Sequence, residues 1–201
     1  MKKVFGVLAI IFLIFLAGCV TNEKYELIFN GVKLYFRGDL NKAINVPVYP
    51  KETLIPDMIL NEKIEKITIA FPNVTKAGYY GVAGYELAYK LTFIYNHLYS
   101  PFSNPEVKEK QNYTCLYYRD FEKEICIGKI IFNEYQTLKG KENEVIIILL
   151  GEGLANKTEI ILNPEKNVIL LKGKSFSQEN RKYTDLDLAV AKFFLVLFSA
   201  L

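Results

Sequence analysis

Residues 144–150 read Glu-Val-Ile-Ile-Ile-Leu-Leu, an apolar run that follows one charged residue. A continuous run of this length is typical of a central β-strand that is covered on both faces. Apolar or alternating segments elsewhere in the chain predict further strands, namely 32–37, 66–71, a hairpin within 113–132, and a second hairpin of 158–162 with 168–171. Residues 43–49 also read as extended, and Pro47 marks them as an edge strand or an irregular stretch. The proline-marked, charged segment 100–111 predicts a loop.

Two other segments have apolar residues at the spacing of an α-helix. Residues 82–98 place apolar side chains at helical spacing, and residues 185–201 read as a terminal helix that Thr184 or Asp185 can cap. The terminal segment is short and contains Lys192, so we expect it to cover a sheet; a tail docked on a membrane is the alternative. Together these elements predict a single α/β or α+β domain with a mixed sheet of about six to eight strands and two main helices.

The overall composition is that of a globular protein. Of the 201 residues, 51% are hydrophobic and 23% are charged, which excludes a disordered chain because a sizeable core can form. The formal net charge is only +3 and the lysines are scattered, so we expect no nucleic-acid partner.

The first residues predict an export signal. Lys2 and Lys3 precede an apolar run over 4–17, which is shorter than the roughly 18 residues that span a bilayer. The run ends in Leu16-Ala17-Gly18-Cys19, which resembles the lipobox of prokaryotic lipoproteins. The resemblance implies cleavage before Cys19, lipidation of its sulfur, and a location on the extracytoplasmic face of the cell membrane. A plain signal peptide with a chance cysteine and an uncleaved N-terminal anchor are the alternatives.

These boundaries divide the chain into three parts: a lipoprotein signal peptide (1–18), a tether (19–30) and one extracytoplasmic domain (31–201). With Cys19 assigned to lipid, Cys115 and Cys126 remain as a pair. A hairpin that turns near residues 120–121 places them directly opposite each other, so we predict a disulfide. Two free thiols in a reducing compartment are the alternative. A metal site is disfavoured because the chain has one histidine and no CxxC spacing.

Three Asn-x-Thr sequons begin at Asn73, Asn112 and Asn156, and each lies at an expected loop or strand end. They are candidate glycosylation sites in a host that modifies exported proteins. Lysine far outnumbers arginine, and glutamate far outnumbers aspartate. This bias favours an archaeal host over a low-GC bacterium.

Residues 148–156 read Ile-Leu-Leu-Gly-Glu-Gly-Leu-Ala-Asn. This strand, glycine and Ala-Asn turn resemble a segment of archaeal surface-layer proteins and related envelope proteins. In those proteins a second strand and glycine precede a threonine-bearing C-terminal helix, and residues 168–173 and 184–198 fill these places here. The sequence departs from the pattern at Glu152, where glycine is expected, and at Gly153, where proline is expected. The resemblance implies kinship with envelope proteins.

Candidate chemical motifs are few. Gly151-x-Gly153 follows a strand, but no GxGxxG or Walker pattern accompanies it, so we read a structural turn. Gly78, Gly81 and Gly84 begin a helix, where they can hold an anion or allow close packing. His97, the single histidine, has no recognisable catalytic partner. We therefore assign no catalytic residue, cofactor or metal.

Two functions from different classes remain. The preferred one is a lipid-anchored envelope protein that binds or assembles with surface-layer or other envelope proteins and carries out no catalysis. The alternative is a membrane-anchored hydrolase of envelope polymers or glycans. The hydrolase predicts acidic side chains that converge in a cleft near residues 78–84 or His97. The binding protein predicts an exposed apolar or tyrosine-rich patch without such acids.

The export prediction is tested by the mass of the protein extracted from its own membranes in mild detergent. We expect the mass of residues 19–201, raised by the mass of a lipid on Cys19 and lowered by the mass of two hydrogen atoms because of the disulfide. A full-length, unlipidated mass with free thiols would contradict it.

Overall fold

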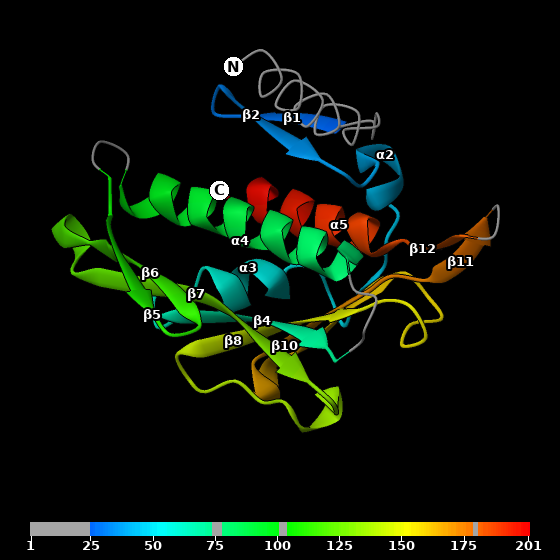
Figure 1. The fold of residues 1–201 in the computed structure, drawn as a ribbon. Coiled ribbons are helices and arrows are strands. Elements are labelled where there is room, and N and C mark those ends of the chain that lie inside the picture. The colour runs from blue at the N-terminus through cyan, green and yellow to red at the C-terminus, as the bar shows by residue number, and fades with distance from the viewer. Residues whose placement is uncertain (1–24, 74–77, 101–103, 179–180) are drawn as a thin grey trace, which may run out of the picture.

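The computed structural model describes residues 25–73, 78–100, 104–178 and 181–201, and shows a single α+β domain (Figure 1). Its centre is an eight-stranded mixed sheet in the order β3-β9-β10-β8-β4-β7-β6-β5. The sheet strands are β3 (Val48–Tyr49), β4 (Lys66–Pro72), β5 (Glu106–Lys110), β6 (Tyr113–Tyr118), β7 (Lys123–Phe132), β8 (Glu144–Leu150), β9 (Glu159–Asn163) and β10 (Val168–Lys172). The expected fold class, strand number and two main helices are confirmed.

Strand β8 lies at the centre of the parallel part of the sheet. It pairs in parallel with β4 on one side and β10 on the other, and every one of its residues is buried. Its two faces belong to two apolar clusters: Val145, Ile147 and Leu149 face one layer, and Ile146, Ile148 and Leu150 face the other. The continuous apolar run at 144–150 therefore reflects burial on both faces, as expected.

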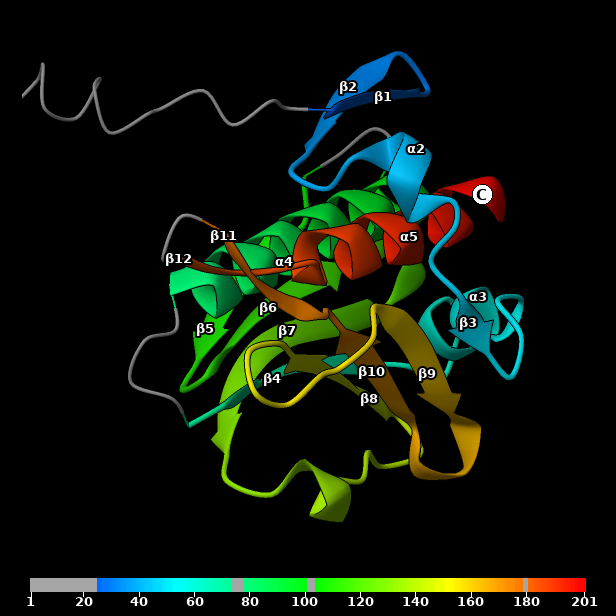
Figure 2. The same ribbon diagram turned by 90° about the vertical axis from the view of Figure 1, so that its right-hand side faces the viewer.

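Two long helices cover one face of the sheet. Helix α4 (Gly78–Tyr99) lies over β4 and β7, and α5 (Leu186–Ser199) lies over β9 and β10 (Figures 1 and 2). The shorter helices α2 (Leu40–Ala43) and α3 (Leu54–Ile59) pack against α5. On the opposite face, the connection between β7 and β8 covers the centre of the sheet with Tyr135 and Leu138.

A hairpin forms a third layer above the helices. Strands β1 (Tyr25–Phe29) and β2 (Val32–Phe36) are joined by Asn30 and Gly31, which both have positive φ. Asn-Gly is the preferred pair for such a two-residue turn. The hairpin corrects the predicted tether, because residues 25–30 are ordered structure and not a polar linker. The predicted signal peptide, Cys19 and the remainder of the tether lie outside the described residues.

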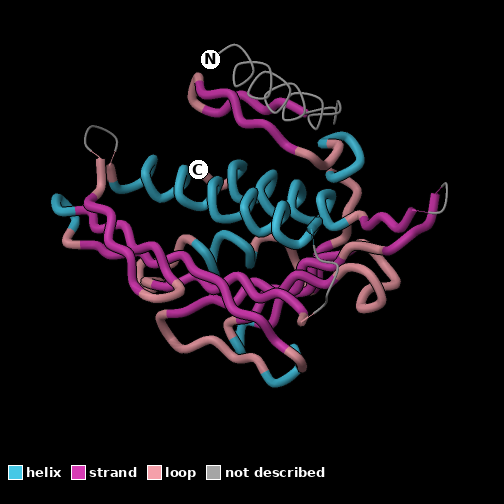
Figure 3. Tube along the Cα trace, viewed as in Figure 1, coloured by secondary structure: helices cyan, strands magenta, loops and turns pink. Residues whose placement is uncertain are grey.

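Other differences have local causes. The expected extended piece 43–49 forms a strand only at its end, where β3 is an edge strand, one of the two readings that Pro47 favours. It begins later than expected because the Asp39 carboxylate accepts hydrogen bonds from the N–H groups of Asn41 (3.0 Å) and Lys42 (3.4 Å) and so begins α2, which ends at Ala43. The expected loop 100–111 contains edge strand β5, whose residues are all exposed. The remaining hairpin, β11 (Ser175–Gln178) with β12 (Arg181–Thr184), precedes α5 (Figure 3).

The terminal helix begins after one of the two predicted cap residues, but without a side-chain cap. Asp185 occupies the N-cap position of α5, yet its side chain makes no capping hydrogen bond. Its carboxylate accepts one from the Thr158 hydroxyl (3.1 Å), and the Thr184 hydroxyl donates to the carbonyl oxygen of Gly173 (2.9 Å). Both side chains therefore join the start of α5 to the ends of β9 and β10. Among the described helices, none has the length and apolar character needed to span a bilayer.

The sheet is also joined across its outer face by a polar chain of contacts. Tyr113 on β6 donates to the Thr68 hydroxyl (3.0 Å), and Thr68 donates to the buried Glu144 carboxylate (2.6 Å). The Tyr113 ring reaches Thr68 because it crosses β7 at Gly128, where a Cβ atom would lie 2.2 Å from the ring. Lys66 pairs with Glu144 at 3.1 Å. Glycine at 128 thus allows β6 to be fastened to β4.

Cys115 and Cys126 are joined by a disulfide between adjacent strands β6 and β7. The register pairs Cys115 with Cys126, Leu116 with Ile125, and Tyr117 with Glu124, which confirms the predicted hairpin. The bond closes a short loop, with a sequence separation of 11.

Removal of this bond tests its contribution to stability. We expect the double variant Cys115→Ser/Cys126→Ser to lose about 3 kcal/mol of unfolding free energy, because the unfolded chain regains the entropy of the closed loop. Urea unfolding followed by circular dichroism measures the difference. The unsubstituted protein under reducing conditions provides the control, and an equal stability of reduced and oxidised protein would contradict the expectation.

Candidate binding groove

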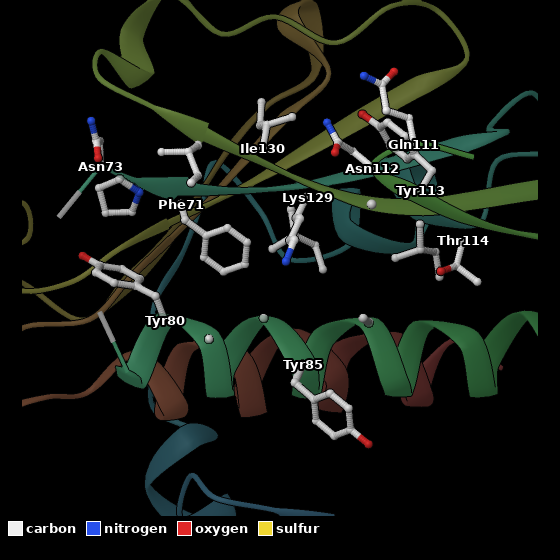
Figure 4. A pocket seen from close by; sticks show the side chains of 18 of the residues that line it. Phe71, Asn73, Tyr80, Tyr85, Gln111, Asn112, Tyr113, Thr114, Lys129 and Ile130 are labelled. Atoms are coloured by element: carbon white, nitrogen blue, oxygen red, sulfur yellow. The ribbon is translucent and has the colours of Figure 1, made fainter. Parts of the chain in front are cut away.

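A groove of ≈ 920 Å³ opens between the N-terminal half of α4 and the part of the sheet formed by β4, β6 and β7 (Figure 4). Ile69 and Phe71 of β4 contribute to its apolar lining. The groove exists because α4 covers β4 but leaves the ends of β6 and β7 exposed.

The helical wall of the groove is made of small residues. Gly81, Gly84 and Ala88 line it, and a Cβ atom at Gly81 would have no neighbour within 4 Å. At Gly84 the situation differs, because a Cβ atom would lie 2.5 Å from the ring of Phe71. Gly84 therefore allows close packing of helix and sheet, one of the two roles that the sequence left open, while Gly81 leaves backbone accessible.

The sheet wall supplies charged and polar groups. Lys129 on β7 extends into the groove (Figure 4), and its side chain has no hydrogen-bond or ion-pair partner among the described residues. Glu109 on β5 accepts a hydrogen bond from the Thr114 hydroxyl at 3.1 Å. Exposed Ile131 adds apolar surface at the end of β7. The groove thus combines an aromatic and aliphatic lining with the ammonium group of Lys129, the one lysine among the described lining residues.

Two tyrosines extend the groove along the outside of α4. Tyr85 lines the groove and is 72% exposed, and its ring stacks on Tyr89 one turn later, with centroids 6.3 Å apart and planes at 13°. Val82 is exposed one turn earlier on the same helix. We call Val82, Tyr85 and Tyr89 the tyrosine strip.

Tyr79 and Tyr80 fasten the start of α4 to the carboxyl end of β8. The Tyr80 hydroxyl accepts a hydrogen bond from the backbone N–H of Gly151 (2.8 Å), and the Tyr79 hydroxyl accepts one from Glu152 (3.1 Å). Burial raises the pKa of Tyr80, so its hydroxyl stays protonated. A phosphate-binding loop would present these N–H groups to its ligand. Because tyrosines already occupy them, Gly151-x-Gly153 acts as a structural turn, as expected.

The acids with shifted pKa values lie outside the groove. Burial raises the pKa of Glu86 and of Asp187, and it lowers the pKa of Lys90. Glu86 and Lys90 form a buried ion pair (2.7 Å) on the side of α4 that faces β2. Asp187 on α5 pairs with Arg37, the residue that follows β2 (3.3 Å). Glu109 is the one carboxylate among the described residues that line the groove.

Lys90 joins the helical layer to the hairpin. Its side chain is only 2% exposed, and its Nζ donates to the carbonyl oxygen of Tyr35 at 2.8 Å. The same ammonium group lies 4.1 Å from the centre of the Phe36 ring. A buried charge requires such partners, so this cluster stabilises the packing of β2 on α4.

The other candidate residues from the sequence are dispersed. His97 lies near the end of α4 remote from the groove, where its Nε2 is 3.0 Å from Asn30 Nδ2 and its ring packs on Phe29. Asn73 and Asn112 are exposed and line the groove, whereas Asn156 is exposed in the loop after β8. Thr75 of the first sequon lies outside the described residues. Glycan attachment at all three asparagines stays a prediction.

Cys115, Glu124 and Cys126 place three possible ligand atoms within 4.8 Å of one another. The two sulfur atoms are joined to each other, so neither is available as a thiolate ligand. Glu124 instead pairs with Lys110 at 2.7 Å. This group is therefore part of the hairpin and not a metal site.

Sequence reasoning did not find the groove. The triplet spacing of Gly78, Gly81 and Gly84, followed by Tyr85, was the signal available, because three small residues in one helix leave room beside it. The partners across the gap, Lys129 and Ile131, come from a strand about 45 residues later, and no local pattern relates them to the helix.

Comparison with known proteins identifies no relative. No family model matches the sequence, and no curated protein or solved structure is significantly similar to the chain. The resemblance to surface-layer proteins therefore stays an expectation. The structure does bring Gly151, Gly173 and Thr184 together, and at Gly173 a Cβ atom would lie 2.2 Å from the backbone nitrogen of Leu186. Glycine there allows the start of α5 to approach the sheet.

The buried pair generates a stability prediction. Lys90→Met leaves the Glu86 carboxyl buried without its cation, and we expect a loss of about 3–5 kcal/mol of unfolding free energy. The double variant Glu86→Leu/Lys90→Met should lose less, because no charge remains buried. Urea unfolding measures both, and Lys129→Met, at an exposed lysine, is the matched control with a change below about 0.5 kcal/mol. Equal losses in the single and double variants would refute the account.

Proposed function

We propose that this protein is a lipid-anchored, extracytoplasmic envelope protein that binds a partner through the groove and the tyrosine strip. The observation that carries the binding role is the groove itself, which has an exposed aromatic rim and a single lining carboxylate among the described residues. Grooves of this kind bury part of a ligand against apolar and aromatic side chains, while a few polar groups fix its orientation.

The anchoring role rests on the sequence. Leu16-Ala17-Gly18-Cys19 resembles a lipobox, and the disulfide between Cys115 and Cys126 supports export because such bonds persist mainly in oxidising compartments. The partner that we propose is a surface-layer protein or another envelope protein. An extended segment of such a partner can lie along α4, with aromatic contacts to Tyr85 and Tyr89 and a carboxylate opposite Lys129.

The arrangement supports binding over hydrolysis of envelope polymers. Hydrolysis of a glycosidic bond by the common mechanism uses two carboxyl groups that flank the bond. Glu109 has no second lining carboxylate among the described residues, and His97 lies at the far end of α4. The acids with raised pKa values are committed to the contact with the hairpin.

Photocrosslinking tests the binding role. We replace Tyr85 with photoreactive p-benzoylphenylalanine in the full chain, expressed in its own host, and illuminate intact cells. Tyr49 on the opposite edge of the sheet is the matched control, because it is also a tyrosine and is 52% exposed. We expect a discrete adduct with an envelope protein from position 85, which weakens on Lys129→Glu, and none from position 49.

Two results would overturn this proposal. Equal adducts from positions 85 and 49 would mean that the groove has no special partner. Release of fragments from isolated envelope by the purified protein, abolished by Glu109→Gln, would establish the hydrolase instead.

A further inference from the structure

The hairpin of β1 and β2 presents an apolar outer face. Strand alternation directs Leu27, Leu34 and Phe36 toward the helices, and it directs Ile28 and Tyr35 outward, where they are 63% and 51% exposed. Exposed Val32 adjoins the turn. The charges on this face neutralise each other, because Lys33 pairs with Glu26 at 3.1 Å. We call Glu26, Ile28, Lys33 and Tyr35 the hairpin face.

This face lies very close along the chain to the expected lipid. Five residues, 20–24, separate Cys19 from Tyr25, the first residue of β1. Even when fully extended, the chain from Cys19 to Tyr25 spans at most about 20 Å. A folded domain of about 100 residues has a radius of gyration of about 13 Å, so it does not fit between the hairpin and a membrane that holds the lipid.

The hairpin is also firmly joined to the rest of the domain. The ring of Phe29 packs against the rings of Phe93 on α4 and Phe198 on α5, with ring centroids 6.3 Å and 4.9 Å apart. Lys90 also donates a hydrogen bond to the carbonyl oxygen of Tyr35. A surface that fixes the hairpin therefore fixes the orientation of both helices and of the sheet below them.

We propose that the hairpin face lies against the surface of the lipid bilayer and orients the domain so that the sheet face opposite α4 and α5 is directed away from the membrane. The proposal rests on the proposed lipid anchor at Cys19. Tyrosine and aliphatic side chains beside a neutral ion pair suit the interfacial region, where tyrosine is enriched. Lipid and hairpin face then provide two membrane contacts at one end of the molecule.

Tryptophan fluorescence tests this contact, because the chain has no tryptophan of its own. We express the full-length sequence carrying Ile28→Trp and reconstitute its lipidated, processed product into vesicles of dibrominated phosphatidylcholine and into matched vesicles without bromine. The control is Gln136→Trp, at an exposed residue of the turn Tyr135–Thr137, which lies at the opposite end of the molecule from the hairpin (Figure 2). Both positions are exposed, so neither substitution disturbs the core.

We expect the emission of Ile28→Trp to shift to the blue and to lose intensity in brominated vesicles, while the emission of Gln136→Trp is unchanged. A blue shift without quenching would mean that a protein or a second copy covers the face, and this would overturn the proposal. Absence of both effects in protein whose mass includes the lipid would also overturn it, with the anchor intact. A mass without lipid on Cys19 would overturn the anchor and this proposal together.

Discussion

The burial of β8 on both faces is the constraint on which the rest of the structure depends. A strand with apolar residues in both directions is stable only if the sheet is covered above and below. Helices α4 and α5 provide one cover, and the connection with Tyr135 and Leu138 provides the other. The parallel pairing of β8 with β4 and β10 also requires long crossover connections, and α4 lies in one of them.

The groove is a consequence of how this cover is distributed. Helix α4 is held at its start by Tyr79 and Tyr80, which bind the carboxyl end of β8, and Gly84 fits it against Phe71. The sheet nevertheless continues beyond the helix through β6 and β5, and no second helix covers that part within the described residues. An uncovered step between helix and sheet remains, with the small residues of α4 on one side and Lys129 on the other.

The buried ion pair has a role that an apolar pair of the same size would not fill. Lys90 connects Glu86 to the backbone of β2, so the position of the hairpin depends on one directional contact in addition to apolar packing. Buried charges of this kind contribute little net stability but strongly disfavour arrangements that leave them unpaired. A hairpin of two strands is marginal alone, and here the helical layer beneath it supplies the missing support.

The sequence by itself determined the elements whose apolar period is local. It predicted β4, the hairpins of β6 with β7 and β9 with β10, both long helices, and the pairing of Cys115 with Cys126, because register follows from the position of a turn. Only the tertiary structure decided the rest. β5 is exposed along its whole length and mostly charged, so its sequence does not look like a strand. β1 lies in a polar stretch that reads as a tether. The groove and the Lys90 contacts join residues that are distant in the chain. The apolar periodicity of one segment cannot predict such contacts, because their free energy arises only when separate elements come together.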